Sequence, residues 1–303
     1  MPWICLPNEM FTPWNACPVK CEAYLTGAKP IPPEQRLFHR GGHPELSLNW
    51  GLNRMQMTTI ERESIQIPVI AVGKGWVAVD KPAGITVHNQ PGRDLCALVS
   101  RLIQKEPELR RQMDVDPDFG VNPVHRLDKE TSGVILLAAD PKMFRFFSEQ
   151  FESRQVKKRY VAVLHGRLEN PDGDDSWGTW RRPLAKTAGG RRHPQGSGRR
   201  FPSETRFRIL QHSARYTLVE MEPLTGRKHQ IRRHAKISGH PVVGDARYGS
   251  TRSVNYLRRN FAFDRLALHA RALTLHLPEG EHPETLETPE IPRSMQALFE
   301  RNP

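Results

Sequence analysis

The chain has 303 residues, enough to bury a core in one large or two modest domains without disulfide or metal staples. Its 45 Lys and Arg against 33 Asp and Glu give a net charge of +12, which favours a polyanionic partner. Four cysteines are too few for a disulfide scaffold, no apolar run approaches the roughly 20 residues of a membrane span, and no signal-peptide pattern opens the chain, so we expect a cytoplasmic protein.

Residues 1–64 differ from the rest of the chain, with scattered Pro, Gly and Trp and no sustained period of 2 or 3.6 residues. They predict an irregular N-terminal extension. It is either a disordered segment or sequence upstream of a true start at Met55 or Met57. We therefore place the boundary after residue 64 and expect one folded domain over 65–303.

Cys17 and Cys21, followed by His39 and His43, have the residue types of a Cys2His2 zinc site. The 17-residue gap between the two pairs is long, and the hydrophobic residues of a small zinc finger are missing. The histidines of the basic motifs further along lack a thiolate or acidic partner at metal-site spacing. No metal site is predicted, and no Gly-rich phosphate loop is present to bind a nucleotide.

Regular structure is expected from about Ile65. Two β-rich runs, 67–72 and 76–80, flank a Gly-containing turn and predict a hairpin. The hairpin leads into a loop with the sequence Lys81-Pro82-Ala83-Gly84.

The segment from Pro123 to Gly133 places Asp128 between two potential cations and runs directly into the apolar stretch 134–138, a predicted buried strand. A carboxylate held near an arginine is stabilised in its charged form. A strand that leaves a tight turn can hold such a side chain rigidly at a cleft. Because most such neighbours are structural ion pairs, the segment alone leaves a catalytic role open.

Helices and strands follow in alternation. Asp140 as N-cap and a proline after it predict a helix over 141–153. Strands are predicted over 159–165 and 215–222, and a helix over 229–238 that ends at Gly239.

The basic residues gather in the middle of the chain. Residues 1–68 hold six basic and six acidic residues and residues 279–303 hold two and six, so the segment between them carries about +16. The run 181–200 has seven Lys or Arg and no acid, which is either a solvated loop or a loop that orders on RNA. Tyr160, after three basic residues, is either a core tyrosine or a stacking surface for a base.

These motifs resemble those of the RluA-type pseudouridine synthases, and the resemblance extends from about residue 65 to 278. It implies an α+β protein with the pseudouridine synthase catalytic fold: a central mixed, mainly antiparallel sheet, flanking helices and a cleft between two halves. Residues 1–64 have neither the charge nor the helical pattern of the S4 RNA-binding domain that many relatives carry. The resemblance rests on Asp80-Lys81-Pro82-Ala83-Gly84, His125-Arg126-Leu127-Asp128, Arg159-Tyr160, Gly226-Arg227-Lys228-His229-Gln230-Ile231-Arg232, Gly239-His240-Pro241-Val242-Val243-Gly244-Asp245 and Leu268-His269-Ala270.

The resemblance implies three catalytic residues. Asp128 matches the catalytic carboxylate, Tyr160 the tyrosine that stacks on the target base, and Arg232 the arginine that pairs with the carboxylate. Arg126 matches an arginine that holds the RNA after the base is flipped. With it, we expect RNA contacts from the nearby basic residues His125, Arg227, Lys228 and Arg233.

The implied reaction converts a uridine in rRNA or tRNA to pseudouridine without a cofactor. Asp128 would initiate cleavage by attack at C1′ or by removing a proton from C2′, and the sequence does not choose between them. Lys228 and the pair Arg232-Arg233 are similar to a tRNA-modifying branch of the family. We expect the enzyme to be a monomer with no membrane partner.

Two other classes remain open. The chain could be a non-catalytic RNA-binding or ribosome-assembly factor on the same fold, although Asp128, Tyr160 and Arg232 are all present. It could also be a glycosidase that acts on a free nucleoside, but this reading does not explain the net charge of about +16 in the middle segment.

Overall fold

The computed structural model describes residues 59–60, 65–170, 173 and 176–301. Most of the predicted N-terminal extension, including the Cys and His residues of the zinc-like pattern, lies outside the described residues. The boundary predicted after residue 64 therefore stays a prediction. A short antiparallel pair, β1 (Thr59–Ile60) with β2 (Ile65–Gln66), begins the described part.

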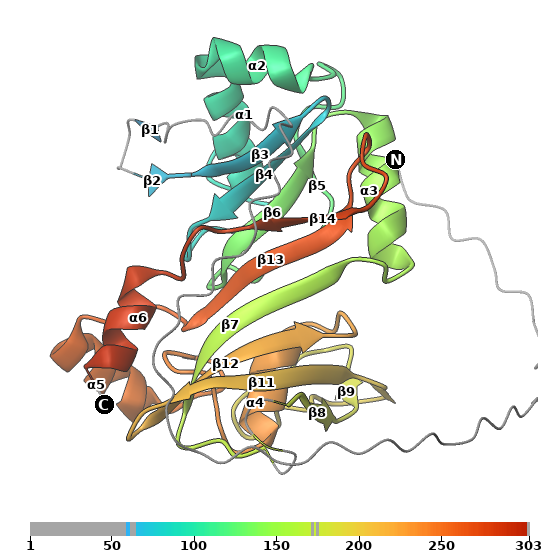
Figure 1. Cartoon of the computed structure of the whole chain (residues 1–303). Helices are drawn as coiled ribbons and strands as arrows, with labels where there is room; N and C mark the ends of the chain where they lie inside the picture. The colour runs from blue at the N-terminus through green and yellow to red at the C-terminus, as the bar shows by residue number, and fades with distance from the viewer. Residues whose placement is uncertain (1–58, 61–64, 171–172, 174–175, 302–303) are drawn as a thin grey trace, which may run out of the picture. The chain divides into compact units, whose positions relative to one another are not determined.

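One half of the fold is built on three antiparallel strands, β3 (Val69–Gly73), β4 (Trp76–Lys81) and β6 (Ser132–Ala138), with the short β5 (Asn122–Pro123) paired to β6 (Figure 1). Every residue of β6 is buried. Alternate residues of β4 and β6 enter two separate hydrophobic clusters, one on each face of the sheet. Burial on both faces explains why the strand is apolar throughout instead of alternating.

Three helices cover these faces. The cluster with Val77 and Ile135 packs against α1 (Leu95–Lys105) and α2 (Pro107–Met113), and the cluster with Ala78 and Leu136 packs against α3 (Pro141–Glu152). The carboxylate of Asp140 caps α3 by accepting hydrogen bonds from the backbone N–H groups of Lys142 and Met143.

The other half continues the same sheet. Four antiparallel strands follow in the order β7 (Lys157–His165), β12 (Tyr216–Pro223), β11 (Glu204–His212) and β8 (Gly178–Arg181), and β9 (Leu184–Ala185) pairs separately with β10 (Arg200–Phe201). Their core cluster also contains residues of α4 (Gln230–Ile237), α5 (Thr251–Phe261) and α6 (Arg293–Glu300).

The strand β13 (Leu268–His276) joins the two halves into one sheet of ten strands within the described residues. It lies antiparallel to β7 and to the edge strand β14 (Pro283–Glu287), and parallel to the start of β6. In Figure 1 it crosses the middle of the sheet between β6 and β7. The segment that leads into β6 therefore lies at the junction of the two halves.

The architecture confirms the predicted α+β fold with a mixed, mainly antiparallel sheet. The predicted hairpin, the strands around β6, β7 and β12, and the helices α3 and α4 are all present within one or two residues of their expected ends. Residues 186–199 form no helix or strand, in agreement with the predicted loop, but Leu184 and Ala185 are buried and pair with Phe201 and Arg200 at its base. Among the described residues, no helix has the length and hydropathy needed to cross a bilayer.

Gly133 provides a test of the junction. Its φ is +115°, and a Cβ there would lie 2.1 Å from the carbonyl oxygen of Ala270 on β13. We expect Gly133→Ala to lower the free energy of unfolding by more than about 3 kcal/mol, because both backbone strain and overlap oppose it. Denaturant unfolding measures the change.

Gly92→Ala is the matched control. Gly92 also has a positive φ, +76°, but nothing lies within 4 Å of the added Cβ. This variant should lose only about 1 kcal/mol, the cost of the backbone conformation. Equal losses at the two positions would contradict a close β6–β13 contact.

Candidate active site

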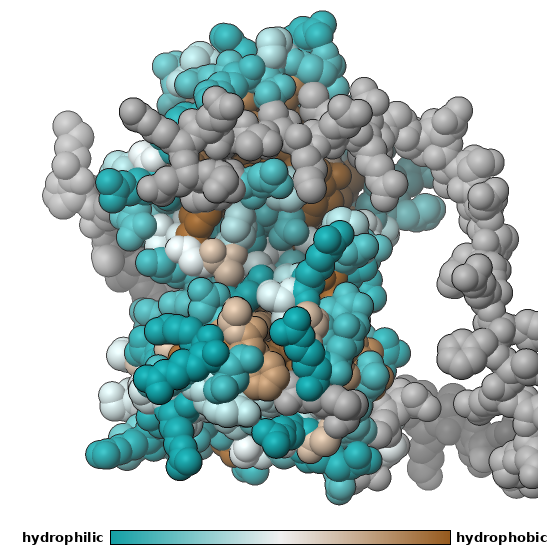
Figure 2. All heavy atoms as spheres, turned by 90° about the vertical axis from the view of Figure 1, so that its left-hand side faces the viewer, coloured by the Kyte–Doolittle hydropathy of each residue, from teal (hydrophilic) through white to brown (hydrophobic). Residues whose placement is uncertain are grey.

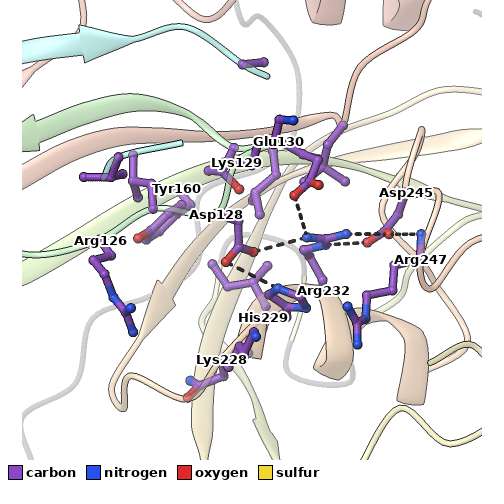
Figure 3. Close-up of a pocket in the computed structure, with 18 of the residues that line it drawn as sticks. Arg126, Asp128, Lys129, Glu130, Tyr160, Lys228, His229, Arg232, Asp245 and Arg247 are labelled. Carbon is purple, nitrogen blue, oxygen red and sulfur yellow. Dashed lines mark hydrogen bonds and ion pairs between the residues drawn. The ribbon is translucent and has the colours of Figure 1, made fainter. Parts of the chain in front are cut away.

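A cleft of about 1530 Å³ lies between the two halves. Its walls come from the loop after β4, the segment 125–131 before β6, Tyr160 of β7, the segment 225–232 that leads into α4, and residues 244–247 (Figure 3). On the face shown in Figure 2, hydrophilic side chains dominate and apolar surface is confined to patches between them. The cleft brings together residues that lie more than 100 positions apart in the sequence.

Asp128 sits in a tight turn at this cleft. Its carbonyl oxygen accepts a hydrogen bond from the N–H of Thr131 (3.1 Å), and β6 begins at the next residue. The buried ammonium of Lys81 donates to the carbonyl oxygens of Lys129 (3.2 Å), Pro82 (2.8 Å) and Ile85 (2.9 Å). Lys81 thus ties the Asp128 turn to the loop after β4. Burial, opposed by the nearby Glu130 and Asp128, lowers the pKa of Lys81 to about 8.

Arg232 connects Asp128 to a second carboxylate. Its Nη1 donates to Oδ2 of Asp128 (3.2 Å) and to Glu130 (3.3 Å), while Nε and Nη2 donate to the two oxygens of Asp245 (2.7 and 2.9 Å). Arg232 is 3% exposed and the side chain of Asp245 is not exposed at all. A guanidinium held by two hydrogen bonds on one edge has little freedom to rotate, so its free edge is aimed at Asp128.

The pKa values of this pair agree with its geometry. Burial alone would lower the pKa of Arg232, but the hydrogen bonds and charge of Asp245 outweigh it and raise that pKa. Burial would likewise raise the pKa of Asp245, and the bonds from Arg232 outweigh it and lower that pKa. Both groups are therefore charged at neutral pH, and each compensates the buried charge of the other.

His229 approaches Asp128 from the other side. Its Nε2 lies 3.6 Å from Oδ1 of Asp128, and its Nδ1 lies 3.0 Å from the hydroxyl of Tyr248. Burial lowers the pKa of His229, against the charge of Asp128, and burial raises the pKa of Tyr248. When the neutral Tyr248 donates to Nδ1, the ring carries its proton on Nε2, directed at Asp128. His229 adopts a left-handed conformation (φ 54°) at the start of α4.

Tyr160 lines the same cleft from β7 and lies beside Asp128 (Figure 3). Burial and the charge of Asp128 both raise the pKa of its phenol, so the side chain is neutral. A neutral ring next to the carboxylate can provide a stacking surface for a base placed over Asp128.

Three of the predicted RNA contacts lie at the cleft. Arg126 and Lys228 are exposed side chains on its wall, and Arg227 lines it with its guanidinium 5.1 Å from the ring of Phe201. His125 also lines it, but its Nε2 accepts a hydrogen bond from the N–H of Leu136 (3.1 Å) and burial lowers its pKa to about 3. His125 is therefore neutral and cannot supply the positive charge that the basic motif predicts.

The position of Arg233 differs from the prediction that this residue contacts RNA. Its side chain is fully buried, and the guanidinium donates to the carbonyl oxygens of Ala185 (3.1 Å) and Lys228 (3.2 Å) and to those of Pro194 and Gln195. All of its nitrogen atoms are occupied by backbone. The prediction that Arg233 binds RNA does not agree with this burial, and the side chain instead fastens a segment of the chain to α4.

Sequence reasoning gave no role to four residues of the site: Lys81, His229, Asp245 and Tyr248. Lys81 and Asp245 lie within motifs that carry the resemblance, and His229 lies within the Arg232 motif. Their contacts reach across the fold, which is why spacing along the chain does not reveal them. Within the part of the chain that the structure describes, no three His, Cys, Asp or Glu side chains are grouped to hold a metal ion.

The chain is similar to known proteins in both sequence and structure. The family model for RNA pseudouridylate synthase matches residues 75–236. A tRNA pseudouridine synthase C of Pectobacterium carotovorum is 37% identical over 234 residues, which cover 73% of this chain and 58% of that protein. A ribosomal large subunit pseudouridine synthase C of Vibrio vulnificus is 34% identical, covering 70% of this chain and 62% of that one. The chain thus spans less than two thirds of the length of these relatives.

A shorter relative is covered more fully. The tRNA pseudouridine synthase C of Haemophilus ducreyi is 34% identical over 232 residues, which make up 70% of this chain and 84% of that protein. The solved structure of human RNA Pseudouridylate Synthase Domain Containing 4 superimposes with a TM-score of 0.59 at 26% identity, covering 77% of this chain and 92% of that one. The range matched by the family model, residues 75–236, contains the Asp128 turn and Tyr160 and ends within α4. The chain belongs to the RNA pseudouridylate synthase family.

Proposed function

We propose that this protein is an RNA pseudouridine synthase that isomerises uridines in rRNA or tRNA. The observation that carries the proposal is the triple contact at Asp128: a carboxylate at the cleft that faces Arg232 at 3.2 Å and His229 at 3.6 Å and lies beside Tyr160. The relatives are named for both tRNA and ribosomal RNA, so the RNA class stays open.

The reaction exchanges one bond for another within a single nucleotide. The N1–C1′ bond of the uridine breaks, the uracil turns, and C5 forms a bond to C1′. The C5 proton is lost to solvent and N1 gains a proton. Nothing is oxidised or reduced, so the chemistry needs no redox partner.

Each residue has a distinct part in this reaction. Asp128 starts the cleavage, at C1′ or at the C2′ proton. Arg232 donates a hydrogen bond to the carboxylate and directs it into the cleft. Tyr160 holds the detached uracil against escape by stacking. Arg126, Arg227 and Lys228 contact phosphates of the flipped nucleotide and its neighbours, which offsets the few kcal/mol that flipping costs.

Removal of the carboxylate tests the proposal. Asp128→Asn keeps the size of the side chain but loses the charge, so we expect at least about a thousand-fold slower tritium release from [5-³H]uridine-labelled, unmodified tRNA or rRNA. RNA affinity should change by less than about three-fold, because a carboxylate makes no attractive contact with phosphate that the substitution could remove.

Asp264→Asn is the control for charge in the same cleft, since Asp264 lines it and is exposed. It should keep near wild-type release. No release by the wild-type protein from either RNA, with tight RNA binding, would favour the non-catalytic binding factor. Formation of free uracil from uridine, with no tritium released, would favour the nucleoside glycosidase.

The hydroxyl of Tyr248 tests whether His229 must be oriented. Tyr248→Phe keeps the ring, whose centre lies 5.4 Å from the guanidinium of Arg232, but removes the hydrogen bond to Nδ1. We expect about a ten-fold lower single-turnover rate at saturating RNA, the value of one hydrogen bond, with unchanged RNA affinity. Tyr256→Phe on the exposed surface of α5 should have no effect. Equal rates for Tyr248→Phe and wild type would show that His229 needs no partner.

The expectations of a monomer, of a cytoplasmic location and of chemistry without a cofactor stay predictions. Size-exclusion chromatography with light scattering measures the first of them. The activity of purified protein treated with a metal chelator tests the expectation that the chemistry needs no cofactor.

A further inference from the structure

Two arginines, the buried Arg233 and the exposed Arg247, hold the basic segment 182–200 against the half that contains α4. Arg233 follows Arg232 on α4, and its guanidinium reaches backbone carbonyl oxygens of Ala185, Pro194 and Gln195. Each hydrogen-bond partner of the Arg233 guanidinium is a carbonyl oxygen, and burial lowers the pKa of Arg233. Burying a guanidinium is costly unless its hydrogen bonds are all made. The segment must therefore stay in place for the half to be stable.

A second arginine holds the middle of the segment. Arg247 lines the cleft, and it donates to the carbonyl oxygens of Ala188 (3.1 Å) and Gly189 (3.0 Å). Within the segment, the N–H of Ala185 donates to Gln195 (2.9 Å). A Cβ on Gly196 would lie 2.2 Å from the carbonyl oxygen of Thr187, so the backbone folds tightly on itself. The segment is a folded wall beside the cleft in the free protein.

The outward side chains of this wall are cations without acidic partners. Lys186, Arg192 and Arg199 are exposed, and no carboxylate among the described residues lies within ion-pair distance of them. The guanidinium of Arg199 lies 5.5 Å from the ring of Phe201, and Arg227, on the cleft wall, lies 5.1 Å from the same ring. One stack of an aromatic ring and two arginines therefore links the cleft to the wall.

We propose that the segment 182–200 is a preformed binding surface for the RNA backbone that flanks the target uridine outside the cleft. The inference rests on the proposed function and adds a second binding region to it. A uridine flipped towards Asp128 leaves its neighbours at the mouth of the cleft, where Arg247 and Arg227 lead to the wall. Unpaired cations bind phosphates with a gain in affinity from counterion release. Because the segment is already folded, binding RNA does not require it to be ordered first, which would weaken the affinity.

RNA length separates this surface from the cleft. We compare the wild type with Lys186→Gln/Arg192→Gln/Arg199→Gln, which leaves the anchors Arg233 and Arg247 intact. The probes are labelled oligouridines of about five nucleotides, enough to fill the cleft, and about 20 nucleotides, enough to leave it. We expect the triple variant to bind the longer probe at least about ten-fold more weakly, with the salt dependence (log Kd against log salt) reduced by about 2, and the shorter probe unchanged.

A matched variant controls for net charge. Lys105→Gln/Arg110→Gln/Lys142→Gln removes three exposed cations from α1, α2 and α3, which lie away from α4 and β9 in Figure 1. It should bind both probes as the wild type does. The proposal would be overturned if both triple variants weakened binding of the longer probe equally. It would also be overturned if the 186/192/199 variant weakened binding of both probes equally.

Hydrogen exchange tests whether the wall is preformed. The amides of Ala185 and Gly196, which donate to Gln195 (2.9 Å) and His193 (3.0 Å), should be protected before RNA is added. Exchange at the rate of an open chain would overturn this part. The proposed function fails separately: it fails if the wild type releases no tritium while the length-dependent loss persists, and the surface fails if release occurs without that loss.

Discussion

The structure depends on one buried guanidinium, that of Arg232, which is shared among the carboxylates of Asp245, Asp128 and Glu130. Arg232 is bound on one edge by Asp245 and presents the other edge to Asp128. Taking a charge out of water costs several kcal/mol, which is recovered only when the geometry is good. The pair therefore fixes α4 against the turn at 244–249 and fixes both against the start of β6. Asp128, which is partly exposed, is oriented by groups that cannot easily move.

The sheet explains why this orientation is possible. Asp128 precedes β6, whereas Arg232 belongs to the half that contains β7 and β12, so the pair would be separated if the halves were independent. The parallel contact of β6 with β13 joins the two halves into one continuous sheet. Gly133 permits this contact because it lacks a Cβ. The cleft thus has walls from both halves but a common floor, and Tyr160 from the neighbouring β7 enters that floor beside Asp128.

Local sequence predicted the elements better than the contacts between them. The helix α3 is predictable because its N-cap and the proline after it are adjacent in the sequence, and β6 because burial on both faces leaves residues 134–138 wholly apolar. The pairing of Asp128 with Arg232, 104 residues apart, came only from the resemblance to a family. Arg233 shows the opposite limit. Three of its four backbone partners lie 38 to 48 residues earlier in the chain, and no pattern of side chains encodes such contacts. The sequence therefore predicts a surface cation where the side chain is buried.

The same features favour the proposed catalyst over a protein that only binds RNA. Affinity for RNA needs exposed cations, and the wall at 182–200 has them without any buried charge facing phosphate. The left-handed conformation of His229 and the buried pair Arg232–Asp245 each cost stability, and hydrophobic replacements of such pairs are often neutral or stabilising by about 1–4 kcal/mol. Their combined effect is to direct a charged donor and a neutral imidazole at one carboxylate. That carboxylate would weaken phosphate binding, so the arrangement is costly for a binding factor and useful for bond cleavage at a sugar.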